Sequence, residues 1–245
     1  MTSLPDDTSA SLPGKVAVVR SLAVMQPYFY PYAGYFRLFA AADRFVVFDC
    51  VQFPRRGRVH RAEVVGPDGS VEWLTLPLAK QPRSTRISEL AFATDARPRF
   101  DAELRRLPWV RSTSGEPAER IREHLNSPLE SVADFLVTGL DLACGLLGLP
   151  GTALRSSSLR IDSQLRGEDR IVEIAHRLNA DRYINAPGGR DLYDFESFAG
   201  AGVDLRFLPP FDGRVFQMLP ALMSGDTATI RGEILDFDEL QSVDG

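Results

Sequence analysis

Residues 19–50 read VRSLAVMQPYFYPYAGYFRLFAAADRFVVFDC and fix the order of the first structural elements. The apolar run 19–25 predicts a buried strand that stops at Gln26 and Pro27. A turn rich in proline and tyrosine follows, then a helical pattern over 35–42 and a second apolar strand over 45–48. If these two strands are parallel, they form one right-handed βαβ unit. The stretch therefore favours an α/β fold.

Working outward from this unit, the sequence alternates between strand and helix patterns. Residues 61–65 and 71–78 flank a Gly-Pro-Asp-Gly turn and predict a β-hairpin. Further helices are predicted over 96–107, 116–125, 129–147, 168–178 and 191–198, and further strands over 154–159, 183–184 and 202–208. We expect a mixed or mostly parallel sheet flanked by helices, with a β-hairpin and a helical insertion at about 95–150.

The composition is that of an ordinary soluble globular protein, with 44% hydrophobic and 25% charged residues. A chain of 245 residues can bury one large core, or one core plus a small lobe, and we favour a single domain over 18–245. Residues 1–17 are rich in Ser, Pro and Asp and predict a flexible tail without a secretory signal. A net charge of -5 gives no global reason to bind nucleic acid.

The cysteine content and the apolar runs indicate a cytoplasmic protein without a membrane span. Cys50 and Cys144 are too few for a disulfide framework, and neither they nor the three histidines have metal-ligand spacing. The longest apolar stretch, 135–149, is shorter than the roughly 20 residues that cross a bilayer. We expect no metal and no cofactor. His124 and His176 fall among charged residues on predicted helices and are expected on the surface.

Residues 44–61, RFVVFDCVQFPRRGRVHR, concentrate the reactive side chains of the chain. Cys50 follows Asp49 at the predicted C-terminal end of a strand, where open α/β sheets hold their ligands. A free cysteine is often only a small buried hydrophobe. Here His60 lies across a Pro- and Gly-containing loop and could act as its base, if that loop turns back. Asp49 could orient His60 or bind a substrate amine.

Other side chains in this region are candidates for substrate binding. Arg55, Arg56 and Arg61 either form a solvated loop face or bind a phosphate or carboxylate, since guanidinium groups bind these anions in a bidentate manner. Gln26 and Gln52 follow predicted strands and could donate to an oxyanion. The remaining candidates are Tyr28 in the aromatic turn and the loop residues Asn185, Gly188 and Gly189, whose backbone N–H groups could face an anion at a helix start.

Four motifs together resemble the WbqC-like protein family: Val24-Met-Gln-Pro-Tyr-Phe-Tyr-Pro-Tyr-Ala-Gly-Tyr-Phe, Phe48-Asp-Cys-Val-Gln-Phe-Pro-Arg-Arg-Gly, Trp73-Leu-Thr-Leu-Pro and Asn185-Ala-Pro-Gly-Gly-Arg-Asp-Leu-Tyr. The resemblance runs from about 22 to 211. It carries over the positions Gln26, Pro27, Pro31, Gly34, Asp49, Gln52, Arg56, Gly57 and Arg61. Cys50 and His60 depart from the residues that many relatives carry, so a mechanism through them belongs to a subgroup at most.

The resemblance implies a role in surface-polysaccharide or specialised-metabolite biosynthesis. It suggests an acyl- or aminoacyltransferase that forms an amide or ester on an amino sugar or other small amine. The donor would be a thioester, plausibly on an acyl or peptidyl carrier protein, and the acceptor could be a nucleotide sugar. Two alternatives stay open at this point: direct transfer with Asp49 as base and no cysteine nucleophile, and a binding module for nucleotide sugars or carrier proteins that does no chemistry.

Overall fold

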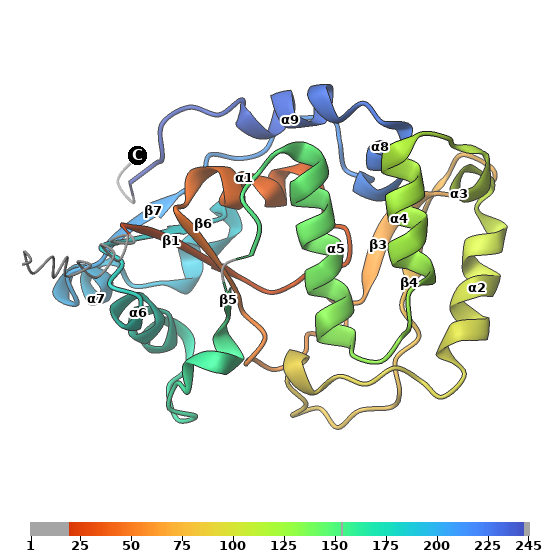
Figure 1. The fold of residues 1–245 in the computed structure, drawn as a ribbon. Helices are drawn as coiled ribbons and strands as arrows, with labels where there is room; N and C mark the ends of the chain where they lie inside the picture. The colour runs from red at the N-terminus through yellow and green to blue at the C-terminus, as the bar shows by residue number, and fades with distance from the viewer. Residues whose placement is uncertain (1–19, 153, 243–245) are drawn as a thin grey trace, which may run out of the picture.

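A five-stranded parallel sheet forms the centre of the molecule (Figure 1). The computed structural model describes residues 20–152 and 154–242, so the tail expected over 1–17 lies outside the described residues. The strands are arranged in the order β5-β2-β1-β6-β7. Their bounds are β1 Ser21–Met25, β2 Arg44–Val47, β5 Leu154–Arg155, β6 Arg182–Asn185 and β7 Asp204–Phe207. The predicted α/β class is confirmed.

β1 lies at the centre of the sheet. The next strands along the chain, β2 and β5, lie on one side of it, and the later strands β6 and β7 lie on the other, so the direction in which strands are added reverses at β1. β1 pairs in parallel with β2 on one side, from Leu22 opposite Arg44, and with β6 on the other, from Ser21 opposite Arg182. The chain builds outward from β1 through β2 to β5, then crosses to β6 and β7. In open α/β sheets, the carboxyl ends of the strands at such a reversal form the usual ligand crevice. The topology therefore points to the edge where β1, β2 and β6 end.

Helices cover both faces of the sheet because its strands are apolar on both sides. A larger core includes Phe36, Leu136 and Leu219 and joins one face of the sheet to α1, α4 (Glu116–Asn126), α5 (Val132–Leu147), α8 and α9. A smaller core packs α6 and α7 on the other face through Ile171 and Phe198. The bounds are α1 Ala33–Ala41, α6 Gly167–Arg177, α7 Phe195–Gly200, α8 Met218–Ser224 and α9 Thr227–Leu235.

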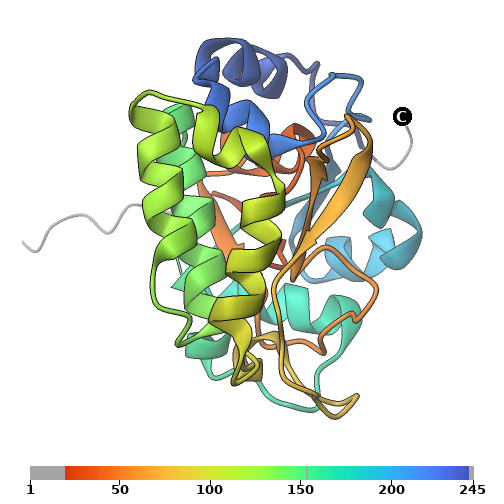
Figure 2. The ribbon, with the colours of Figure 1, turned by 90° about the vertical axis from the view of Figure 1, so that its right-hand side faces the viewer.

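The expected hairpin and helical insertion lie between β2 and β5. β3 Arg61–Val65 pairs antiparallel with β4 Val71–Thr75, and Gly69 takes a positive φ of 83° in the turn. The insertion consists of η1 Ile87–Glu89, α2 Ala96–Arg106, α3 Pro108–Ser112, α4 Glu116–Asn126 and α5 Val132–Leu147. Figure 2 shows α2 beside the hairpin, where Arg106 of α2 donates to Glu72 of β4 at 2.9 Å.

Three sequence-based expectations are wrong in detail. The strand expected over 154–159 ends at Arg155, and residues 156–159 form the 3₁₀ helix η2 Ser156–Leu159. The helix expected over 191–198 is replaced by η3 Pro187–Leu192 and α7, separated by Tyr193 and Asp194. His124 is 5% exposed and not on the surface, because its ring packs between α4 and α5 and bonds to Tyr30 and Phe135.

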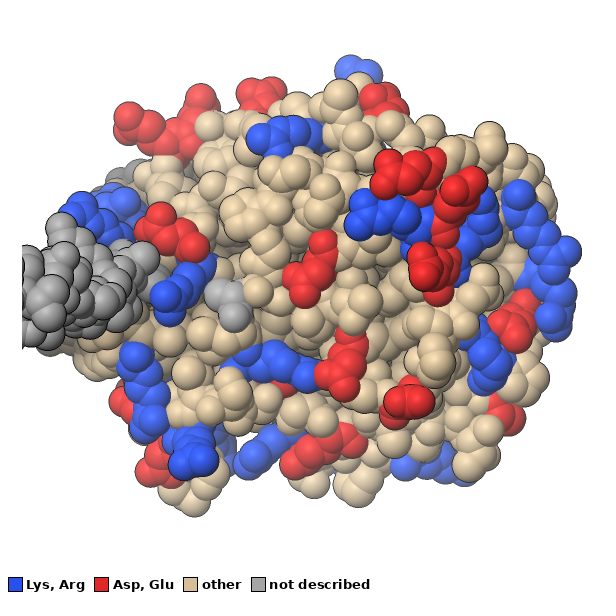
Figure 3. All heavy atoms as spheres, in the orientation of Figure 1, with Lys and Arg blue, Asp and Glu red and all other residues tan. Residues whose placement is uncertain are grey.

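Charged side chains are distributed over the surface in both signs. On the face shown in Figure 3, Lys and Arg of the described residues are interspersed with Asp and Glu, around a broad area that carries few charges. Among the residues that the structure describes, no helix has the length and apolar character needed to cross a bilayer.

Candidate active site

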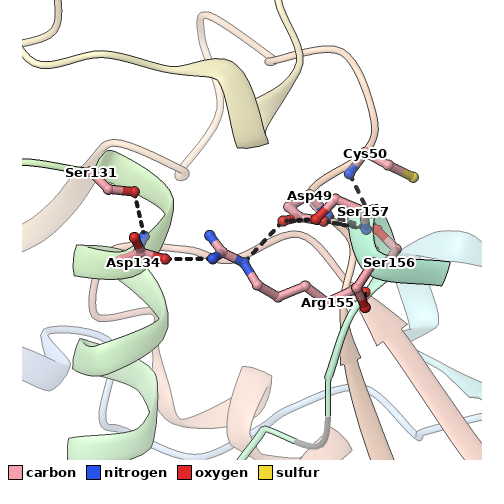
Figure 4. Close-up of polar contacts among 8 residues, drawn as sticks. Asp49, Cys50, Ser131, Asp134, Arg155, Ser156 and Ser157 are labelled. Atoms are coloured by element: carbon pink, nitrogen blue, oxygen red, sulfur yellow. Dashed lines mark hydrogen bonds and ion pairs between the residues drawn. The ribbon is translucent and has the colours of Figure 1, made fainter. Parts of the chain in front are cut away.

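Asp49 is the polar centre of the carboxyl edge of the sheet (Figure 4). Its side chain is fully buried, because it lies between the ends of β2 and β5. One carboxylate oxygen accepts from the Ser157 backbone N–H at 2.9 Å and from the Ser156 hydroxyl at 3.1 Å. The other accepts from the Ser157 hydroxyl at 2.8 Å and from Arg155 Nε at 3.0 Å. Both carboxylate oxygens are therefore occupied by groups from the last residue of β5 and the two residues after it.

The same segment fixes the backbone of Cys50. The Ser156 hydroxyl oxygen accepts from the backbone N–H groups of Asp49, at 3.1 Å, and Cys50, at 3.2 Å. In Figure 4 the Cys50 sulfur points away from the Asp49 carboxylate. Asp49 and Ser156 therefore fix the main chain of Cys50, while its side chain points away from them.

The Cys50 thiol faces a pocket of about 470 Å³ that we call the arginine pocket. Its lining residues include Cys50, Gln52, Arg86, Arg166, Arg170 and Tyr193. Cys50 follows β2, Tyr193 follows η3 beyond β6, and Arg166 directly precedes α6. The pocket is therefore lined by segments from both sides of the central strand β1. No Asp or Glu is among its lining residues in the part of the chain that the structure describes. The pocket is thus cationic.

Arg170 is the cation closest to the thiol. Its Nη1 lies 3.3 Å from the Cys50 sulfur and 3.2 Å from the Cys50 carbonyl oxygen. The side chain is buried, and its other donors go to backbone carbonyls of 162–165. Among the described residues, no carboxylate forms an ion pair with it. A buried cation compensated only by carbonyl dipoles stabilises an anion placed beside it, such as a thiolate or an oxyanion.

His60 lies in a different pocket from Cys50. It lines a pocket of about 600 Å³ between the hairpin and α2, together with Trp73, Leu76, Pro77, Arg99 and Glu103, which we call the hairpin pocket. Its ring packs edge-on against Phe53. Burial, and then the charge of Arg61, lower the pKa of His60. The structure therefore brings Cys50, Asp49 and Gln52 to the sheet edge, and it places His60 with the hairpin.

Two of the predicted loop arginines, Arg55 and Arg61, contact backbone carbonyls, whereas Arg56 is exposed. Arg55 donates to the Gln81 carbonyl, and Arg61 donates to the carbonyls of Gly57, at 3.0 Å, and Arg56. The Arg61 guanidinium also lies 4.3 Å from the centre of the Trp73 ring. These contacts hold the loop after β2 against the hairpin, and the arginine pocket takes its charges from other elements.

Three further predicted residues follow the ends of β1 and β2, namely Gln26, Tyr28 and Gln52. The Gln26 carbonyl accepts from the Tyr35 hydroxyl at 2.7 Å, and the Tyr28 and Tyr35 rings are in contact. Gln52 Nε2 donates to the Arg83 carbonyl at 2.6 Å at the rim of the arginine pocket.

The backbone at Asn185–Gly189 differs from the anion cradle expected there. Asn185 is buried, and its side-chain oxygen accepts from the Ala186 N–H. Gly188 and Gly189 lie within η3, and the Gly189 N–H donates to the Ala186 carbonyl at 3.0 Å. A Cβ on Gly189 would come within 2.2 Å of Asn185 Nδ2. Gly189 is therefore needed for close packing on Asn185, and its N–H is not available to an anion.

Sequence reasoning missed the residues that complete the site. Arg155 ends β5, and Ser156 and Ser157 follow it. This polar run carries a signal, because polar residues at the C-terminal end of a parallel strand belong at the same sheet edge as Asp49. Arg170 carries a second signal, since it precedes Ile171 and shares the buried side of an otherwise amphipathic helix. No pattern in the sequence indicated that Arg86 and Arg166 belong to the site. Among the described residues, no three His, Cys, Asp or Glu side chains come together as a metal centre requires.

The structure is an open α/β sheet with a cationic crevice at its carboxyl edge, which is where proteins of this fold class commonly hold their ligands. The chain belongs to the WbqC-like protein family, whose sequence model matches residues 26–217. It is 29% identical over 199 residues to the uncharacterized protein Rv1507c of Mycobacterium tuberculosis, a match that covers 74% of this chain and 78% of that protein. No solved structure matches the chain significantly.

Proposed function

We propose that the protein is an acyl- or aminoacyltransferase in which Cys50 accepts an acyl group from a thioester and passes it to a small amine. The observation that carries this proposal is the thiol itself, which lines the arginine pocket with its sulfur 3.3 Å from Arg170 Nη1. A cation beside a thiol supports the thiolate that attacks a carbonyl. The other cysteine, Cys144, is 1% exposed, and burial raises its pKa.

The proposed reaction has two steps, each an exchange at the acyl carbon. In the first, the Cys50 sulfur bonds to the thioester carbonyl carbon, the donor C–S bond breaks, and the departing thiolate takes the proton that Cys50 loses. In the second, the acceptor nitrogen bonds to the same carbon, the bond to Cys50 breaks, and the amine proton returns to the sulfur. Negative charge builds on the carbonyl oxygen in both steps, and a preorganised donor such as Arg170 stabilises it by about 3 kcal/mol.

The charges of the arginine pocket suit a phosphorylated partner. Arg86 and Arg166 add two guanidinium groups to the buried Arg170 at one opening. Guanidinium binds phosphate in bidentate fashion, so a pantetheine phosphate on a carrier protein or the diphosphate of a nucleotide sugar would be retained there. Such a partner fits the role in surface-polysaccharide or specialised-metabolite biosynthesis that the family resemblance implies. We place this role in the cytoplasm because the chain has only two cysteines.

Intact-mass measurement tests the covalent step. The protein is incubated with a small acyl thioester, and we expect one adduct of the acyl mass in the parent chain and in Cys144→Ala. The same adduct should be absent in Cys50→Ala. Because Cys50 and Cys144 are the two cysteines of the chain, the pair of variants assigns the adduct to one thiol. An adduct that persists in Cys50→Ala, or none in the parent, contradicts the proposal.

The direct-transfer alternative, with Asp49 as general base, has less geometric support. Asp49 is fully buried and both of its oxygens accept from Arg155, Ser156 and Ser157, so no oxygen faces the pocket as a free proton acceptor. Turnover retained in Cys50→Ala would choose this alternative. Binding of nucleotide sugar or carrier protein without any product would instead choose the binding module.

A further inference from the structure

Arg86 and Arg166 give the wall of the arginine pocket two exposed guanidinium groups. Among the described residues, neither group forms an ion pair with a carboxylate. Glu89 accepts from the backbone N–H of Arg86 at 2.9 Å, and Arg166 Nη1 donates to the Leu165 carbonyl at 2.9 Å. Both positive charges are therefore available to an anion that enters the pocket.

Arg170 differs from these two arginines because its donors already have protein partners. Its Nη1 contacts Cys50, and its Nε and Nη2 donate to the Leu165 carbonyl at 3.0 and 2.7 Å. Its buried charge still makes the surroundings of the thiol more positive. Direct contacts to a second anionic group, apart from the reacting carbonyl oxygen, thus fall to Arg86 and Arg166.

The start of α6 adds backbone donors to the same wall. Gly167, its first residue, lines the pocket with a positive φ of 49°, and a Cβ there would meet nothing within 4 Å. The N-cap residue Arg166 makes no side-chain hydrogen bond to the first turn. The acidic residues of that turn, Glu168 and Asp169, do not line the pocket, and Glu168 accepts from the Asp194 N–H. A helix start beside two guanidinium groups favours a phosphate.

The size of the pocket limits how far this phosphate can lie from the thiol. A volume of about 470 Å³ corresponds to a sphere roughly 10 Å across, and Cys50 lines the same space. A phosphate on a small ring or short chain lies only a few bonds from the other functional groups, at about 1.5 Å per bond. In an extended pantetheine thioester, three linked units separate the phosphate from the sulfur by about 15 Å. Such an arm, with its sulfur at Cys50, would place its phosphate beyond the pocket.

We propose that the arginine pocket binds a small phosphate ester through Arg86, Arg166 and the start of α6, with the rest of the ester facing Cys50. In the acyl transfer proposed above, this ester is the acceptor, an amine whose own phosphate holds it beside the acyl-cysteine. The phosphate of the pantetheine arm lies outside the pocket. The assignment as acceptor rests on the proposed function, and the binding of the phosphate does not.

Calorimetry at constant ionic strength tests the phosphate site in the absence of any thioester. The probes are two matched pairs, glucosamine 1-phosphate with glucosamine and phosphoethanolamine with ethanolamine. We expect at least one phosphorylated probe to bind saturably and about tenfold more tightly than its unphosphorylated partner. Arg86→Gln and Arg166→Gln should each weaken this binding about tenfold, the value of one charged hydrogen bond.

Arg111→Gln is the matched control, because it removes the same charge from an exposed position on α3 and should leave the affinity unchanged. Circular dichroism checks that the three variants are folded. The phosphate site is overturned if neither phosphorylated probe binds more tightly than its partner. It is also overturned if the two folded pocket variants bind like the parent.

A second measurement separates the acceptor from the donor. Intact mass gives the rate at which Cys50 is acylated by S-acetylpantetheine and by its 4′-phosphate in Cys144→Ala. We expect equal rates, because the donor phosphate lies outside the pocket. A rate about tenfold higher with the phosphorylated donor overturns the assignment of the ester as acceptor. If neither thioester acylates Cys50, that assignment falls with the proposed function, while calorimetry still decides the phosphate site.

Discussion

We infer that Asp49 positions Cys50, because its carboxylate accepts from the Ser156 hydroxyl that binds the Cys50 N–H and it is not among the residues that line the arginine pocket. Its buried carboxylate depends on Arg155, whose side chain is 30% exposed and also contacts Asp134 on α5. An ion pair with one fully buried partner is sensitive to loss of that partner, because several donors then lose their acceptor in an environment without water.

We predict that Asp49→Ala lowers the free energy of unfolding by about 3 kcal/mol. Asp134→Ala removes the other carboxylate on Arg155, which is 63% exposed, and should cost less than about 1 kcal/mol. Urea unfolding of the two variants measures both values. Equal losses of unfolding free energy in the two variants would show that the buried carboxylate of Asp49 stabilises the fold no more than the exposed one of Asp134.

The positioning role has a readout separate from stability. In folded Asp49→Asn, the amide cannot accept from all the donors that the carboxylate serves, so the Cys50 backbone loses its fixed orientation. We predict that the rate at which an acyl thioester or a maleimide modifies Cys50 changes severalfold, while Asp134→Asn leaves it unchanged. Stopped-time intact-mass measurement gives both rates, and an unaltered rate in folded Asp49→Asn contradicts the role.

Helices α4 and α5 are joined through a buried histidine. His124 Nε2 lies 2.9 Å from the Phe135 carbonyl, which only accepts, so Nε2 carries the proton. Nδ1 then accepts from the Tyr30 hydroxyl at 2.9 Å. Gly139 on α5 allows this approach, since a Cβ there would lie 2.9 Å from His124 Cε1. The neutral ring thus connects the aromatic turn after β1 to both helices.

This element predicts a pH-dependent stability. Burial lowers the pKa of His124 below its ordinary value, and the hydrogen bond to Phe135 offsets this only in part. The unfolded chain therefore binds a proton more readily, so stability is full above pH 6.5 and falls as the pH drops below it. His60 contributes in the same direction. We expect His124→Gln to weaken the pH dependence of the free energy of unfolding, measured by urea unfolding at several pH values. His176→Gln should leave this dependence unchanged. The same pH dependence in both variants contradicts the prediction.

Across the whole molecule, one large core joins the sheet to the hairpin and to the helical insertion. It contains Val47 of β2, Leu74 of β4, Phe100 of α2 and Leu219 of α8. Because these residues pack in one cluster, the hairpin and insertion cannot expose their apolar faces independently of the sheet.

We therefore predict a single cooperative unfolding transition for residues 18–245. Trp73 lies in the hairpin and Trp109 in α3, so their fluorescence reports on the hairpin and the insertion, while far-UV circular dichroism reports on all helices. The two signals should change at the same urea concentration. Separate midpoints would show that the insertion unfolds as its own unit.

Local patterns predicted the elements better than they predicted the site. The βαβ unit, the hairpin and the helices over 96–147 follow from periodicity and turn residues, which act over short distances. The C-terminal helices α8 and α9 were not predicted, although Met218, Leu219, Leu222 and Met223 show a helical spacing.

The candidate site depends on crossovers that the local sequence does not encode. Asp49 and Cys50 were placed correctly at a strand end, but Arg170 reaches Cys50 across 120 residues and Ser156 reaches it across 106. Cys50 and His60 are ten positions apart in the sequence, which left the distance between them open. In the structure the two residues line different pockets, because β3 begins at Arg61 and His60 therefore lies in the hairpin pocket.

Residue 50 is held from both sides by its main chain, through its N–H on Ser156 and its carbonyl on Arg170. These two contacts do not depend on which side chain residue 50 carries. A serine, an alanine or a carboxylate there would be presented to the arginine pocket in the same place. The fold thus provides one position, residue 50, at which a single substitution can change the reactive group in the arginine pocket. The residues that hold the main chain at this position stay unchanged.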